Sequence, residues 1–78
     1  MKHYYKSITE IKKVDRDGAF VSSHYYIKYF NGATKLKKNF AELPKIAQKQ
    51  VGRHIGIKSI EQSAPDKLGI TVYTIIYG

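Results

Sequence analysis

The residues that could support acid–base or metal chemistry are few and lie far apart in the sequence. The three histidines (His3, His24 and His54) fall in separate segments, and no His-x-x-x-His or His-x-Glu spacing that could hold zinc occurs. Cysteine is absent, and so is a Gly-x-x-x-x-Gly-Lys phosphate loop. The acidic residues fall mostly in predicted turns or on predicted solvent faces: Glu10, Asp15, Asp17, Glu42, Glu61 and Asp66. Because catalysis needs convergent groups, we predict that the protein is not an enzyme and holds no metal or cofactor.

Two features that resemble reactive sites have simpler structural interpretations. Asp15 and Asp17 resemble the opening of a calcium-binding loop, but the oxygen ligands required further along are missing, so we interpret them as turn residues. His54 is expected at a helix end, where it can interact with the helix dipole. His24 stands apart because it shares a predicted face with Tyr26 and Lys28, although one histidine does not define a general acid or base.

The charge balance points to the class of partner. The chain has 14 Lys and Arg against 6 Asp and Glu, a formal net charge of +8. A surface of this kind attracts polyanions, so we expect the partner to be an acidic protein surface, a nucleoprotein complex or nucleic acid itself. Only Arg16 and Arg53 are arginines, and lysine lacks the planar fork that recognises guanine, so sequence-specific base readout is not expected. A second explanation for part of the lysine excess is coding bias in an A·T-rich genome, and that part would have no functional meaning.

Length and hydropathy set the size and location of the protein. A chain of 78 residues can bury one modest core, so we predict a single domain over residues 1–78. No apolar run approaches the roughly 20 residues that cross a bilayer. The opening residues, Met1-Lys2-His3-Tyr4-Tyr5, lack the apolar core of a signal peptide. We therefore expect a protein without membrane contact in the cytoplasm, which would be the host's if a phage encodes it.

A hairpin is expected to carry the residues that could bind a partner. Ala19 to Phe30 is predicted to be a strand, and it runs into Asn31-Gly32, a strong signal for a two-residue turn. Pairing Phe30 with Ala33 would place Lys28 opposite Lys35. One face would then be core: Val21, Tyr25, Ile27, Tyr29, Leu36 and Phe40. The other face would alternate cations with rings: His24, Tyr26, Lys28, Phe30, Lys35 and Lys37.

This second face allows two interpretations. Two lysines opposite each other repel across a strand pair, and an anion between them would relieve the repulsion. Phosphates could lie between the lysines while bases stack on Tyr26 or Phe30, the combination that single-strand binders use. Alternatively the face is solvated, with Tyr chosen for its strand propensity and Lys for protection of a sheet edge.

One helix is predicted between the strands. Its apolar face has the i, i+3, i+4, i+7 spacing: Leu43, Ile46, Ala47, Gln50, Val51 and His54. Asn39 and Glu42 resemble a capping box and Pro44 suits a first turn, so the helix should start between Phe40 and Pro44, and Gly52 or Gly56 should end it. A stripe without acidic residues points outward: Lys45, Lys49 and Arg53. It fits an acidic or phosphate-bearing partner, or serves solubility alone.

The remaining segments complete an α+β fold. His3 to Val14 is predicted to be a strand with a bulge or a twist near Thr9, because its alternation slips. Ile55 to Gln62 and Ile70 to Tyr77 should form a second hairpin. The last strand is apolar on both faces, as in a central strand or at a homodimer contact. We predict an antiparallel sheet of about five strands, in the order βββαββ along the chain, with one helix on one face.

Two resemblances arise from these residues. Asp17-Gly18, Tyr25-Tyr26-Ile27-Lys28-Tyr29-Phe30 and Lys35-Leu36-Lys37-Lys38-Asn39-Phe40 up to Gln50 resemble the arm-type DNA-binding domains of tyrosine recombinases, in which a three-stranded sheet backed by a helix enters the major groove. The match covers about half of the chain. No Trp stands in the second strand, and a whole hairpin follows the helix.

The whole chain is similar to small phage-encoded accessory proteins, including basic anti-CRISPR inhibitors that obstruct nucleic-acid-binding surfaces. The similarity is one of architecture: a short Lys-, Tyr- and Ile-rich chain without a catalytic cluster, and a helix followed by Ile57-Lys58-Ser59-Ile60-Glu61. It implies a non-catalytic binding protein of phage or mobile-element type that docks on a nucleic-acid-handling complex, or on its nucleic acid, to inhibit or regulate it. The alternative is a DNA-binding domain that uses its sheet face.

Overall fold

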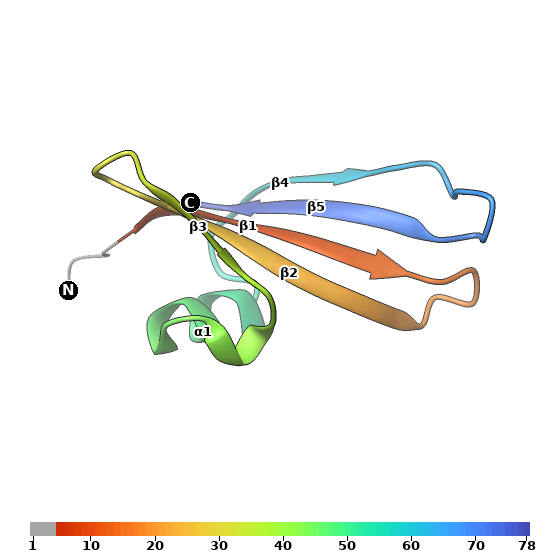
Figure 1. Cartoon of the computed structure of the whole chain (residues 1–78), viewed down its shortest axis with the longest axis horizontal. Helices are drawn as coiled ribbons and strands as arrows, with labels where there is room; N and C mark the ends of the chain where they lie inside the picture. Colours follow the sequence, from red (N-terminus) through yellow and green to blue (C-terminus); the bar gives the residue numbers. More distant parts are fainter. Residues whose placement is uncertain (1–4) are drawn as a thin grey trace.

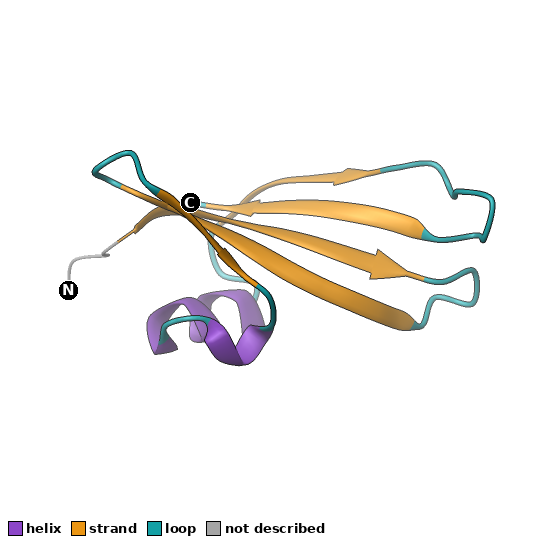
Figure 2. Ribbon diagram, viewed as in Figure 1, coloured by secondary structure: helices purple, strands orange, loops and turns teal. Residues whose placement is uncertain are grey.

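The computed structural model describes residues 5–78 and contains one antiparallel sheet with one α-helix packed on one face (Figure 1 and Figure 2). The elements are β1 (Tyr5–Val14), β2 (Phe20–Tyr29), β3 (Thr34–Lys37), the 3₁₀-helix η1 (Phe40–Glu42), α1 (Lys45–Gly52), β4 (Ile57–Gln62) and β5 (Thr71–Tyr77). The predicted α+β class and the order βββαββ are confirmed. The start of the first predicted strand, at His3 and Tyr4, lies outside the described residues.

The strands lie in the order β3-β2-β1-β5-β4, so β1 is the centre of the sheet. It pairs with β2 on one side and with β5 on the other, and Ile8 is opposite both Ile27 and Tyr77. Strand β5 lies between β1 and β4. A strand in this position has neighbours along both edges and packs toward the helix with one face, so each of its residues is buried or half-buried although the other face has no second layer.

The core lies between α1 and the sheet. It is made of Tyr5, Ile8, Tyr25, Ile27, Leu43, Ala47, Val51, Ile75 and Tyr77. Ala47 is fully buried, and its small side chain lets the helix backbone approach the strands closely. Figure 1 shows α1 under one end of the sheet, while the β1–β2 and β4–β5 hairpins extend beyond it at the other end. The molecule is therefore elongated, with extents of 42 × 21 × 20 Å.

The helical region is divided in two by Pro44. Asn39 caps η1 as predicted, because its side-chain oxygen accepts a hydrogen bond from the backbone N–H of Glu42 at 3.2 Å. The α-helix itself begins one residue after Pro44, at Lys45, and Pro44 occupies the N-cap position. It ends at Gly52, the first of the two predicted stops, and the chain then turns through His54 (φ 53°) and Gly56 (φ 72°) into β4.

The turn between β2 and β3 corrects the predicted register by one residue. The backbone N–H of Gly32 donates to the Tyr29 carbonyl at 3.0 Å, and that of Tyr29 donates to the Ala33 carbonyl at 2.8 Å. The loop therefore has three residues and not two, and Gly32 takes the left-handed conformation (φ 89°) that closes such loops. The Asn31 side chain accepts from the Ala33 N–H at 2.9 Å, an Asx turn that favours this longer loop.

The shift by one residue exchanges the two faces of β3, because side chains alternate along a strand. Tyr26 now pairs with Leu36, and Lys28 pairs with Thr34 and not with Lys35. Leu36, predicted to be core, is 48% exposed on the side away from the helix. The predicted repulsion of Lys28 and Lys35 across the strand pair is therefore wrong.

The bulge or twist predicted near Thr9 is not found, because the β1 register is regular there, and bulges occur at three other places in the described strands. The pairing skips one residue at Lys6 in β1, at Val21 in β2 and at Lys58 in β4. Val21, which was predicted to be core, is the residue skipped at the β2 bulge and is 49% exposed. Phe40, also predicted to be core, sits in η1 with 41% of its surface exposed. The core is consequently smaller at this edge of the sheet than predicted.

Candidate nucleic-acid interface

The face of the sheet opposite the helix, called here the open face, carries three of the predicted binding residues. His24, Tyr26 and Lys28 alternate along β2, and their partners in β1 are Ile11, Thr9 and Ser7. The one-residue shift adds Leu36 and Thr34 of β3 to the same face. Lys13 of β1 joins them, since it pairs with Ser22 and is exposed.

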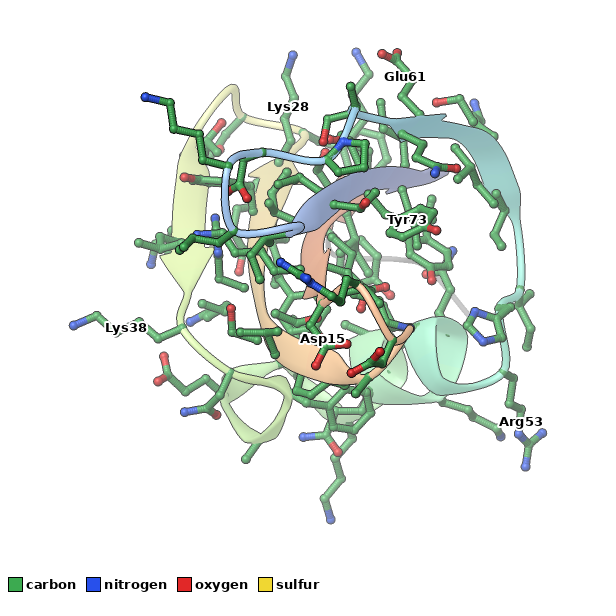
Figure 3. All side chains as sticks on the ribbon, turned by 90° about the vertical axis from the view of Figure 1, so that its right-hand side faces the viewer. Asp15, Lys28, Lys38, Arg53, Glu61 and Tyr73 are labelled. Atoms are coloured by element: carbon green, nitrogen blue, oxygen red, sulfur yellow. The ribbon has the colours of Figure 1, made fainter. Side chains whose placement is uncertain are left out.

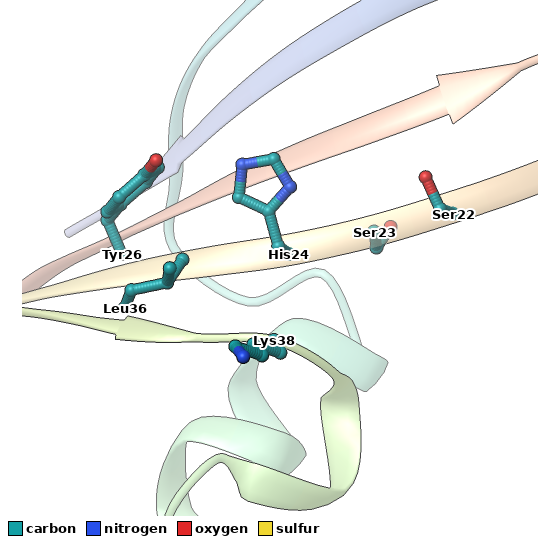
Figure 4. A pocket seen from close by; sticks show the side chains of 6 residues that line it. All are labelled: Ser22, Ser23, His24, Tyr26, Leu36 and Lys38. Atoms are coloured by element: carbon teal, nitrogen blue, oxygen red, sulfur yellow. The ribbon is translucent and has the colours of Figure 1, made fainter.

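A hollow of about 300 Å³ lies on the open face, next to the end of β3. It is lined by Ser22, Ser23, His24, Tyr26, Leu36 and Lys38 (Figure 4). It exists because β2 runs from Phe20 to Tyr29 while β3 pairs with it only over Tyr25–Lys28. Residues 20–24 therefore have β1 on one side and no strand on the β3 side. A second hollow of about 390 Å³ lies along this part of the chain, between Phe20 and Phe40.

The rings of the open face contact each other. His24 and Tyr26 have ring centroids 5.5 Å apart and an interplanar angle of 81°, a T-shaped pair. Figure 4 shows both rings standing on the same side of β2, with Leu36 beside Tyr26. Tyr26 is 40% exposed, because the sheet has no second layer on this side. The pair therefore forms an accessible aromatic surface fixed to a strand.

The other predicted members of this face lie elsewhere. Phe30 is in the β2–β3 turn and is 70% exposed. Lys35 pairs with Ile27 and Lys37 pairs with Tyr25, so both lie on the helix side of the sheet. The Lys35 Nζ atom is 6.0 Å from the centroid of the Tyr29 ring, which itself packs against the core. These cations border the helix side and do not contribute to the open face.

The helix stripe is exposed as predicted, but on the other side of the molecule. Lys45, Lys49 and Arg53 all face solvent. Figure 3 shows Lys28 above the sheet and Arg53 beyond the helix, below it. A single flat partner therefore cannot contact the open face and the whole stripe together.

The positive charge is not compensated within the protein. In residues 5–78 no Lys or Arg forms an ion pair with a carboxylate. Four carboxylates accept backbone or hydroxyl hydrogen bonds instead. Asp15 accepts from the N–H groups of Asp17 and Ala19, and Asp66 accepts from those of Leu68 and Ile70. Glu42 accepts from the N–H of Lys38 and from the Asn39 amide.

The fourth carboxylate, Glu10, is buried at 7% exposure, whereas most of the acids were predicted to lie in turns or on solvent faces and the burial of Glu10 was not foreseen. It accepts hydrogen bonds from the hydroxyls of Tyr77 (3.2 Å), Ser23 (3.3 Å) and Tyr25 (3.4 Å). Burial raises the pKa of Tyr77 and of Tyr25, and the negative charge of Glu10 raises both further. Glu10 shares the face of Ile8, two residues before it, and this alternation is the sequence signal for its burial.

The histidines and acids of the described part of the chain do not gather into a metal site. Among residues 5–78 no group of three or more His, Asp or Glu side chains could hold a metal ion. His54 follows the end of α1, and its Nδ1 lies 3.5 Å from the Tyr77 hydroxyl oxygen. In the same part of the chain, no helix has the length and hydropathy needed to cross a bilayer.

The comparisons with known proteins add no relative. No family model matches the chain, and no curated protein or solved structure matches it.

Proposed function

We propose that the protein is a non-catalytic nucleic-acid-binding protein. It contacts phosphates through the part of its open face that carries Lys13, Lys28 and Lys38. The observation that supports this most directly is the absence of any ion pair to the lysines and arginines of residues 5–78. In a chain with net charge +8, four of the six carboxylates accept hydrogen bonds in turns or in the core and none pairs with a described lysine or arginine, so the positive field is directed outward. Phosphate groups spaced along a nucleic-acid backbone are the matching ligand.

The positive and negative charges of the open face lie at different edges of the sheet. Lys28 and Lys13 lie over β2 and β1, and Lys38 borders the hollow at the end of β3. The acidic residue of this face, Glu61, is on β4 at the opposite edge of the sheet. A strand of nucleic acid laid over β1, β2 and β3 would thus meet cations and avoid the carboxylate.

The predicted role as an inhibitor of a nucleic-acid-handling complex uses the same surface. Its partner would be a phosphate-bearing nucleoprotein, or an acidic groove that imitates one. Free nucleic acid is the simpler ligand for the exposed cations, and the test below separates the two.

The test is a salt titration with two charge-matched variants. One variant changes Lys13, Lys28 and Lys38 to Gln, and the other changes Lys45, Lys49 and Arg53 to Gln, so that each loses three positive charges. Binding of a fluorescent oligonucleotide is measured by anisotropy at low and at physiological salt. We expect the open-face variant to lower the slope of log affinity against log salt by about 2 to 3, since each phosphate contact adds roughly 0.7 to 0.9.

The helix variant should keep most of the affinity at physiological salt, and the oligonucleotide should be recovered uncut. Equal losses in both variants would mean that only net charge matters. Binding that disappears at physiological salt would contradict the proposal and favour an acidic protein or a nucleoprotein as the partner, because shape then has to add to charge.

A further inference from the structure

We infer that the hollow on the open face is a stacking site for an unpaired nucleobase, so that the ligand is single-stranded nucleic acid. The inference rests on the proposed function and names its substrate class. In the hollow an exposed ring, an apolar side chain and a cation meet: Tyr26, Leu36 and Lys38.

The chemistry of the hollow suits a base. The T-shaped contact with His24 uses at most one face of the Tyr26 ring. Leu36 adds apolar surface next to that ring, while Ser22 and His24 supply polar groups that can meet the edge of a base. Its volume, about 300 Å³, is at the lower end of the range for small-ligand sites and corresponds to one ligand unit, not to a duplex.

The cations are placed for the backbone on either side of such a base. Lys28 lies two residues beyond Tyr26 on the same face, which is about 7 Å along the strand. Lys38 borders the hollow, and Lys13 lies across from Ser22 at its other end. A base on Tyr26 would have a lysine within reach of the phosphate before it and of the phosphate after it.

A duplex cannot use this arrangement. Its bases are paired and stacked on one another, so no base face is free to lie on Tyr26 without being unstacked first. An unpaired strand presents each base in turn, and stacking on an aromatic ring tolerates any sequence. This agrees with the shortage of arginine, which leaves few groups able to read base edges.

The experiment compares three ligands of equal length on the unaltered protein: a deoxythymidine oligonucleotide, the same backbone with abasic residues, and a duplex. The first two carry the same phosphates, so their difference isolates the base. We expect the oligonucleotide to bind about 5- to 150-fold more tightly than the abasic strand, with a similar salt slope. It should also bind more tightly than the duplex.

Two variants test whether the difference in affinity between the normal and the abasic strand comes from the hollow. Tyr26→Ala should remove the difference between the two strands without lowering affinity for the abasic one, and Tyr26→Phe should preserve the difference. Phe30→Ala is the matched control, because Phe30 is an exposed ring outside the open face. If Tyr26→Ala fails to fold, the comparison of strands on the unaltered protein still decides.

The outcomes separate this inference from the proposed function. Equal affinity for the normal and abasic strands, with a steep salt slope, would overturn the stacking site and leave phosphate binding intact. Tighter binding of the duplex would overturn it as well. If no ligand binds at physiological salt, both proposals fail.

Discussion

The hydroxyl of Tyr77 donates a hydrogen bond to Oε1 of Glu10 at 3.2 Å, although 67 residues separate them in the sequence. The contact joins β5 to the central strand beneath the helix. Glu10 keeps its place in the core because three hydroxyls replace the water that a carboxylate loses on burial. The two central strands are therefore held by a polar contact as well as by their backbone ladder.

Replacing Tyr77 with Phe should destabilise the protein by about 1 to 3 kcal/mol, because one donor to a buried charged acceptor is lost while the ring remains. Chemical denaturation followed by circular dichroism measures the change. Tyr73→Phe is the control: Tyr73 packs against the same core, but its hydroxyl has no hydrogen-bond partner among residues 5–78. Equal effects of the two variants would show that the Glu10 contact adds nothing to stability.

Alkaline pH should weaken the fold through the tyrosines. Burial raises the pKa of Tyr77, Tyr25 and Tyr5 above its ordinary value, so the folded state holds these protons more tightly than the unfolded state does. Their contribution to stability is complete below about pH 10 and is lost as the pH rises through the folded pKa values. Denaturation midpoints measured from neutral to alkaline pH should fall in that window.

The pH experiment needs a control variant that lacks the tyrosines whose pKa is raised. The double variant Tyr25→Phe, Tyr77→Phe lacks two of the hydroxyl groups whose pKa is raised and leaves the rest of the chain unchanged. Its midpoint should fall less steeply above about pH 10 than that of the unaltered protein. Parallel curves would show that Tyr25 and Tyr77 do not cause the alkaline loss of stability.

Gly32→Val should cost at least about 1 to 2 kcal/mol, the penalty of placing a side chain in the left-handed conformation. A Cβ at Gly32 would meet no heavy atom within 4 Å, so the cost is conformational and not steric. Gly52→Ala is the contrast, because Gly52 ends α1 without a positive φ and its added Cβ would touch only the Phe40 ring at 3.7 Å. That variant should be neutral or stabilising; an unchanged midpoint for Gly32→Val would contradict the three-residue loop.

Element types could be predicted from the sequence because local patterns determine them. Tyr, Ile and Val at strand spacing and the single run with a period of 3.6 gave the order βββαββ, and Asn39 capped the helical region at the predicted position. Pro44 and Gly52 then set the ends of α1 within one residue. Each of these features depends on neighbours that lie a few positions away.

Register and burial depended on information that local patterns lack. Asn31-Gly32 suits a two-residue loop and a three-residue loop alike, and the choice between them moved Lys35 and Lys37 away from the face of Lys28. Alternation with Ile8 places Glu10 on the core face, but its hydrogen-bond donor Tyr77 reaches it only through the β1–β5 pairing. The hollow beside Tyr26 arises from the short length of β3, which no residue in β2 encodes.

The short third strand also leaves residues 20–24 of β2 with an unpaired edge. Such an edge is a template on which another copy of the chain could add a strand and begin to aggregate. A net charge of +8 keeps copies apart, and Lys38 stands beside the exposed edge as a gatekeeper. The same lysines that suit an anionic ligand thus provide colloidal protection, and salt that screens them would remove both at once.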